Sequence, residues 1–135
     1  MSDATIEPTP QQFARLAACE DSGPIVMLNL LRFKERADGI HAGQGITGAE
    51  AYARYGAAVA EHLERVGGRI LFALGPEDSV IGPQDGEWDL VIAVEYPSRR
   101  AFLEMTSSPD YLEIHGHRAA ALADSRLIAC KRLPA

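Results

Sequence analysis

The chain has 135 residues, of which 47% are hydrophobic and 24% are charged, and its formal net charge is −6. This length and composition are typical of one globular domain that needs no metal or disulfide staples, so we expect a single domain over residues 1–135 with its core over about residues 25–131. An acidic surface repels phosphate groups, which argues against nucleic acid and anionic membranes as partners.

The N-terminal stretch and the two cysteines predict a cytoplasmic protein. Residues 1–10 show neither the basic nor the apolar region of a signal peptide, and no apolar run approaches the length of a membrane span. Cys19 and Cys130 fit no metal spacing and lie among apolar neighbours. We therefore expect two buried thiols in a reducing compartment.

The first predicted elements are a short helix and an apolar strand. Thr9, Pro10 and Gln12 are typical of a helix start, and this helix is expected to end near Glu20. Residues 25–33 (IVMLNLLRF) predict a strand. Its alternate residues form two faces, one with Met27, Asn29, Leu31 and Phe33 and the other with Val26, Leu28, Leu30 and Arg32.

A polar, glycine-rich stretch over residues 34–46 predicts a mobile loop. Thr47 and Glu50 then form a capping box, which opens a long helix to about Val66. The two glycines after Val66 are expected to end this helix with a left-handed cap. The elements predicted for the rest of the chain are a strand over residues 69–75, a strand over 88–96, a helix from the Ser98 cap to Met105, a helix from Pro109 to about Ala123, and a strand over 125–131.

This order of elements predicts the fold class. Strand, helix, strand, strand, helix, strand is the βαββαβ pattern of the ferredoxin-like α+β fold, with an extra N-terminal helix. We expect one four-stranded antiparallel sheet with its helices on one face.

The bare face of such a sheet should be polar in a monomer, but both phases of every predicted strand are apolar. In the third strand Leu90, Ile92 and Val94 oppose Val91 and Ala93, and in the second Ile70, Phe72 and Leu74 oppose Leu71 and Ala73. A homodimer packed through its sheet faces would cover the bare surface.

A resemblance to a known family rests on six segments, which read VMLNLLRFK, AYARYG, GGRILF, WDLVIAVEYPS, SPDY and SRLIAC. Together they resemble the uncharacterised family called domain of unknown function thirteen-thirty, from about Ile25 to Cys130. That family is similar to the dimeric α/β-barrel superfamily, so the resemblance implies this fold and a dimer. Relatives there include small monooxygenases that work without metal or flavin, lactone isomerases and haem-binding peroxidases. The family has no established reaction.

Asn29 is the first candidate catalytic residue, because a neutral amide within an apolar strand loses its hydration unless something bonds to it. Either backbone or water satisfies it, or it points into a pocket between helices and sheet and holds a carbonyl or enolate oxygen. The resemblance adds that the small cofactor-free monooxygenases use a strand asparagine and a tryptophan in this way.

His115 is the second candidate, for proton transfer, with a packed core histidine as the alternative. His117 lies two residues later and points about 200° away on a helix, so the two cannot hold one metal ion and we expect no metal site. His117 is expected to face solvent beside Glu113. His62 is expected to serve packing.

The aromatic candidates for substrate binding are Trp88, Tyr52 and Tyr55. They would line a pocket for a flat apolar ligand, or simply pack in the core with their polar tips at the rim. Arg118 would either bind a ligand carboxylate or pair with Asp110 or Glu104.

Residues 43–48 (GQGITG) match a dinucleotide-binding pattern, but about nine polar residues separate them from the strand, so a loop ending in a helix cap is favoured. The sequence thus favours an apolar small-molecule pocket without a bound cofactor, in a binding protein or in an enzyme of cofactor-independent monooxygenase or isomerase type. There Asn29, Trp88 and His115 would polarise the ligand, shape the pocket and transfer protons. Two alternatives stay open: a non-catalytic ligand-binding or structural dimer, and a haem binder with His115 or His62 as axial ligand.

Overall fold

The structure is a computed structural model that describes residues 4–134. Its elements in chain order are α1 (Pro10–Ala18), β1 (Ile25–Phe33), the 3₁₀ helix η1 (Gly39–His41), α2 (Gly48–Arg65), β2 (Arg69–Leu74), β3 (Leu90–Tyr96), α3 (Arg99–Ser107), α4 (Pro109–Ala121) and β4 (Leu122–Cys130). No helix in this part of the chain is both long enough and apolar enough to cross a membrane.

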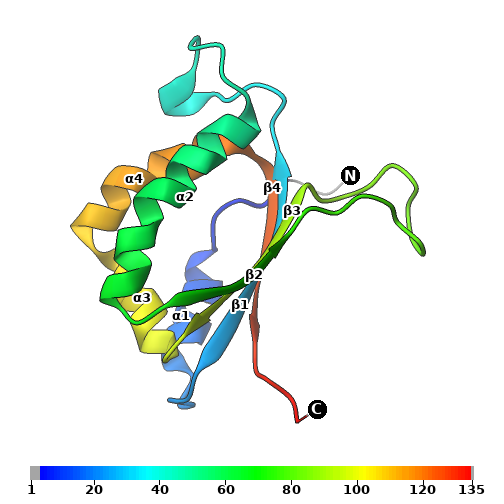
Figure 1. Ribbon diagram of the computed structural model, residues 1–135. Helices are drawn as coiled ribbons and strands as arrows, with labels where there is room; N and C mark the ends of the chain where they lie inside the picture. The colour runs from blue at the N-terminus through cyan, green and yellow to red at the C-terminus, as the bar shows by residue number, and fades with distance from the viewer. Residues whose placement is uncertain (1–3, 135) are drawn as a thin grey trace.

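The four strands form one sheet in the order β2-β3-β1-β4, and every neighbouring pair is antiparallel. Helices α2, α3 and α4 lie together on one side of the sheet (Figure 1). This arrangement confirms the predicted ferredoxin-like α+β fold with an extra N-terminal helix. The long β2–β3 connection, residues 75–89, projects to the opposite side, away from the helices (Figure 1).

The predicted helix boundaries follow from side-chain caps that the structure contains. The side chains of Thr9 and Thr47 each accept a hydrogen bond from the backbone three residues later, and both capping boxes are complete. Ser98 and Ser108 cap α3 and α4 in the same way. Gly67 has a φ of 76°, the left-handed conformation expected after α2.

The two faces of β1 are as predicted, because Met27 and Asn29 lie on the helix side and Leu28 and Leu30 on the other. The predicted phase of β2 was wrong after Ile70. A register shift between Ile70 and Phe72 places Phe72 opposite Ala93, on the face away from the helices. A bulge inserts one extra residue into a strand, so the alternation after it is reversed.

The face away from the helices, here called the outer face, carries a continuous apolar row across all four strands. Cross-strand neighbours place Phe72, Ala93, Leu28 and Ile128 side by side in β2, β3, β1 and β4. The side chains of Phe72 and Ile128 remain 44% and 46% exposed. Exposure of such an apolar row to water is unfavourable, so we expect a second surface to cover it.

Residues 34–46, predicted as a mobile loop, are held against α4 by backbone hydrogen bonds. The Asp38 amide donates to the Ala120 carbonyl at 3.1 Å, and η1 brings His41 to a buried position with 4% exposure. A ring nitrogen of His41 lies 2.8 Å from Nδ1 of His117. His117 is half-buried against this loop, so the expectation that it faces solvent beside Glu113 was wrong.

Close backbone packing explains the last glycine of the GQGITG segment, Gly48. A Cβ at this position would lie 2.3 Å from the Lys34 carbonyl oxygen and 2.6 Å from that of Ala121. Only glycine lets the start of α2 approach these two backbone segments, and the Gly48 amide donates to the Lys34 carbonyl at 3.0 Å. The segment thus closes a packing contact between α2, β1 and α4.

The expectation of two buried thiols was wrong. Cys19 is exposed, because it follows the end of α1, a helix without a buried residue. Cys130 is partly exposed, because its register partner is Val26 and it therefore lies on the outer face at the edge strand β4.

Candidate functional site

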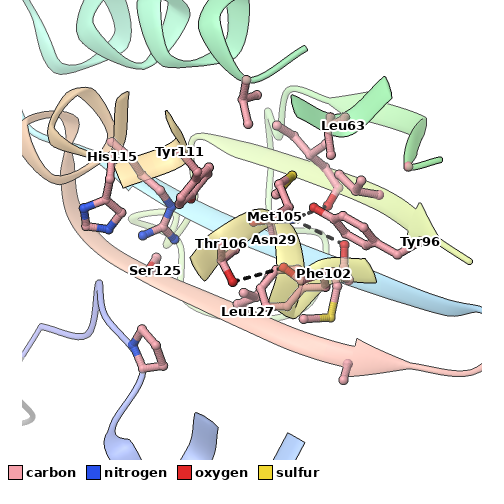
Figure 2. Close-up of a pocket in the computed structure, with 18 of the residues that line it drawn as sticks. Asn29, Leu63, Tyr96, Phe102, Met105, Thr106, Tyr111, His115, Ser125 and Leu127 are labelled. Carbon is pink, nitrogen blue, oxygen red and sulfur yellow. Dashed lines mark hydrogen bonds between the residues drawn. The ribbon is translucent and has the colours of Figure 1, made fainter. Parts of the chain in front are cut away.

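A cavity of about 1410 Å³ lies between the sheet and the helices, and Figure 2 shows part of its lining. Its floor is the helix-facing side of β1, β3 and β4, and its roof comes from α2, α3 and α4. Most of the lining is apolar or aromatic, and all four tyrosines of the chain belong to it: Tyr52, Tyr55, Tyr96 and Tyr111. Such a space suits a small molecule with a large apolar surface.

Asn29 lies on the floor of the cavity, between its cross-strand neighbours Ile92 and Leu127. Its Nδ2 group donates to the backbone carbonyls of Met27 and Ile92, each at 3.3 Å. Carbonyl oxygens only accept, so the amide orientation is set and Oδ1 is the atom left for a ligand. The expected hydrogen bond from Asn29 to an enolate oxygen does not fit this geometry, because both donors already serve the backbone. Asn29 instead offers an acceptor.

The hydroxyls of Tyr55 and Tyr111 lie 2.8 Å apart in a buried hydrogen bond that joins α2 to α4. The Tyr52 ring lies 5.4 Å from the Tyr55 ring, so three tyrosines form one aromatic cluster under the roof. Aromatic pairs at such distances add to the stability that burial provides. The predicted pocket role of Tyr52 and Tyr55 is consistent with their place in the lining, and Tyr111 joins them.

Burial raises the pKa of each of these three tyrosines, and it raises that of Tyr52 to about 12. The nearby Arg118 guanidinium acts in the opposite direction on all three pKa values. The phenols therefore stay neutral at ordinary pH, and the cluster presents hydroxyl groups rather than phenolates.

Residues 4–9 are here called the N-terminal strap, and residues 5–9 of it line the cavity beside β4 and α4. The Thr5 and Ser125 side chains each donate to the other residue's backbone carbonyl, at 2.8 and 2.6 Å. The Thr5 amide donates to Asp124, which lowers the pKa of that carboxyl to about 2. These bonds join the first residues of the fold to its last strand.

His115 lies at the edge of the cavity, as one of its predicted roles requires (Figure 2). Its Nε2 atom is 3.0 Å from a carboxylate oxygen of Glu7 in the strap. A carboxylate that accepts a hydrogen bond from one ring nitrogen fixes the tautomer and leaves the other nitrogen able to take a proton. The pair can therefore act as a base with its orienting group.

Arg118 lines the cavity one helical turn after His115 and is half-buried. Its Nη1 atom donates to the Ile6 carbonyl of the strap at 2.6 Å. The predicted pairing with Asp110 or Glu104 is not formed: Asp110 instead lies 3.3 Å from Arg65. Within residues 4–134, no ion pair joins Arg118 to an acidic side chain.

Trp88 does not belong to the cavity lining in the part of the chain that the structure describes. The guanidinium groups of Arg32 and Arg126 lie 5.6 and 5.2 Å from its ring centroid. The expectation that Trp88 lines the substrate pocket was therefore wrong. Strand β3 begins only at Leu90, so the alternation of the strand does not direct the Trp88 side chain.

The histidines do not suit axial ligation of a haem in this cavity. The His115 Nε2 atom is bonded to Glu7, and the His62 ring packs edge-on against Tyr111 outside the cavity lining of the described residues. Residues 4–134 also contain no group of three or more His, Cys, Asp or Glu side chains that could hold a metal ion.

A profile of the family described as "Domain of unknown function (DUF1330)" matches residues 42–131. The chain belongs to the DUF1330 family. No protein with a curated description matches it.

Solved structures extend the comparison from the DUF1330 family to its fold. A protein of unknown function from Rhodopseudomonas palustris is 45% identical, with a TM-score of 0.90 over 98% of this chain and 99% of that chain. A dimeric protein of unknown function with a ferredoxin-like fold, from Bacteroides fragilis, is 8% identical, with a TM-score of 0.51 over 82% and 97%. A protein provisionally named an antibiotic biosynthesis monooxygenase, from Bacteroides thetaiotaomicron, is 14% identical, with a TM-score of 0.51 over 83% and 91%. The last two likenesses show the fold alone.

Sequence reasoning missed three features of this DUF1330 site. The strap with Glu7, the hydroxyl pair of Tyr55 and Tyr111, and Ser125 all depend on contacts between distant parts of the chain. No periodicity signals such contacts. The one available signal for the aromatic cluster was the spacing of Tyr52 and Tyr55, which lie three residues apart and so share one side of a helix.

Proposed function

We propose that this DUF1330 protein binds a small apolar or aromatic molecule in the cavity between its sheet and its helices. The observation that carries this proposal is the cavity itself, with a volume of about 1410 Å³ and a lining that is mainly apolar and aromatic. Ligand sites of about 300–1,000 Å³ already bury most of a drug-sized molecule. Each 100 Å² of apolar ligand surface removed from water here contributes roughly 2.5 kcal/mol.

A catalytic role is the second candidate, and the pair of His115 and Glu7 favours it. With Glu7 bonded to Nε2, Nδ1 of His115 is the nitrogen that can take a proton from a bound substrate. Asn29 Oδ1 would accept a hydrogen bond from a hydroxyl or amine of the same substrate. This chemistry would suit an isomerase, or a monooxygenase without a bound cofactor like the fold relative that carries that provisional name.

We also propose that two copies pack through their outer faces. The row of Phe72, Ala93, Leu28 and Ile128 supplies a self-complementary apolar strip, as a twofold interface requires. The projecting connection over residues 75–89 lies on the same side and carries two almost fully exposed apolar residues, Val80 and Ile81. The Bacteroides fragilis protein with this fold is described as dimeric, which supports a dimer here.

A fluorescence titration with 1-pyrenebutanol, a flat neutral probe, tests the binding proposal. Val91 and Ile92 are adjacent in β3, both half-buried, and point to opposite faces of the sheet. Ile92→Trp places a bulky indole on the floor of the cavity and is expected to weaken pyrenebutanol binding at least tenfold. Val91→Trp places the same indole group on the outer face and is expected to leave the affinity unchanged. Equal affinities of both variants and the wild type would refute binding in the cavity.

A further inference from the structure

We propose that the ligand of this cavity carries a carboxylate, and that the guanidinium of Arg118 binds it. The inference rests on the proposed binding function and names the chemical class of the ligand. It comes from one observation: Arg118 is a half-buried cation inside an apolar cavity, and no acidic side chain of the described residues pairs with it.

The guanidinium of Arg118 keeps most of its hydrogen-bonding capacity. It has five N–H donors in a planar fork, and the structure uses one nitrogen, Nη1, for the Ile6 carbonyl. That bond fixes the side chain from the strap side. A planar group held in this way is prepared for two parallel hydrogen bonds to a carboxylate, the geometry that arginine favours.

The surroundings of Arg118 make an anion favourable there. Burying a guanidinium without a counter-ion costs free energy. A carboxylate that binds beside Arg118 and displaces water recovers part of this cost. The neighbouring tyrosines cannot neutralise the charge, because their buried phenols remain protonated. The Tyr52 hydroxyl has no hydrogen-bond partner within residues 4–134, so it is a further donor for the same anion.

The charge of the cavity lining points in the same direction. Although the chain has a net charge of −6, its cavity is lined by five arginines and two glutamates. Two of these arginines are already paired, Arg69 with Glu95 and Arg126 with Asp124. Arg15 has no acidic partner in the described residues either, but it is exposed on α1, where water screens its charge. Arg99 is also half-buried and has no ion pair within residues 4–134, but its charge acts on Asp21. The charge of Arg118 acts on the tyrosine cluster, so Arg118 is the half-buried cation beside the aromatic part of the cavity.

A matched pair of probes tests the proposal on the full-length protein. 1-Pyrenebutyric acid and 1-pyrenebutanol share the apolar body and differ in the terminal group. In the wild type the acid is expected to bind at least about tenfold more tightly than the alcohol, a difference of about 1.4 kcal/mol. Arg118→Gln is expected to remove this preference while leaving the affinity for the alcohol within about twofold.

Two further variants separate position from charge. Arg15→Gln removes an exposed arginine of the same lining and is expected to leave the preference intact. Arg118→Lys keeps the charge but loses the fork, and is expected to keep only part of the preference. Circular dichroism on each variant confirms that the fold is retained.

Each outcome is decisive for one claim. If the alcohol binds in the cavity but the acid binds no better, the carboxylate proposal fails and the binding function stands. If neither probe binds, or both bind with Ile92→Trp as they do with the wild type, the binding function itself fails. A preference that survives Arg118→Gln would also overturn the assignment to Arg118.

Discussion

The hydroxyl groups of Tyr55 on α2 and Tyr111 on α4 lie 2.8 Å apart, in a hydrogen bond buried above the cavity. The bond joins the two helices that form most of the roof. Both tyrosines line the cavity, and without the other each hydroxyl would lack a hydrogen-bond partner within residues 4–134. The same two hydroxyls therefore hold α2 and α4 together and supply polar groups to the cavity lining.

Tyr55→Phe is expected to lower the free energy of unfolding by about 1 kcal/mol, because Tyr111 then keeps a buried hydroxyl without its partner. Tyr111→Phe should cost about the same. In the double variant neither hydroxyl remains, so the loss should be smaller than the sum of the two single losses. Urea unfolding of the four proteins measures this coupling, and additive losses would show that the bond contributes nothing.

The tyrosines also predict the alkaline titration of the protein. All four have a pKa raised above the ordinary value of 10 by burial, and Tyr52 reaches about 12. A group whose pKa is raised by folding stabilises the native state fully below pH 10, and this stabilisation is lost as the pH rises through the native pKa. Absorbance at the tyrosinate band should therefore show no step near pH 10 in the native protein. A step there by even one tyrosine would contradict the burial of the cluster.

Gly48 and Gly56 lie on the same helix and predict opposite results for the same change. A Cβ at Gly48 would meet the Lys34 carbonyl at 2.3 Å, whereas one at Gly56 would meet nothing within 4 Å. Gly48→Ala is expected to lower the free energy of unfolding by about 3 kcal/mol through backbone displacement. Gly56→Ala should raise it by roughly 0.5–1 kcal/mol, since alanine is the better helix former. Denaturant unfolding compares them, and equal effects would contradict the close packing at Gly48.

The outer face predicts the oligomeric state. Phe72→Glu places a charge at the β2 end of the apolar row and is expected to convert the proposed dimer to a monomer at micromolar concentration. The matched change Ile70→Glu lies before the register shift, on the helix side of the same strand, and should leave the dimer intact. Sedimentation equilibrium distinguishes the two. A wild-type protein that is monomeric at that concentration would refute the proposed interface.

The sequence predicted β1 because residues 25–33 form a nearly unbroken apolar run of strand length, and the period of two then places alternate residues on opposite faces. The same reasoning failed in β2, since a bulge after Ile70 reverses the alternation and no residue type announces it. It also failed for Trp88, which precedes the start of β3 and so is not directed by the strand.

The candidate site was predictable only where a residue belongs to a regular element. Alternation brought Asn29 to the floor, and helical spacing brought Tyr52 and His115 to the roof and edge. The orientation of the Asn29 amide depends on a carbonyl of the neighbouring strand, 63 residues away in the chain. The partner of His115 is Glu7, 108 residues away. Contacts between residues so far apart in the chain follow from tertiary packing, and local sequence patterns do not predict them.

A crystal structure of the protein with bound 1-pyrenebutyric acid tests the central claim most directly. The proposed binding predicts the pyrene between the sheet and α2, in contact with Ile92 and Tyr52, and the carboxylate about 3 Å from the Arg118 guanidinium. Density for the pyrene on the outer face beside Phe72, or a cavity filled by the protein's own side chains, would contradict it.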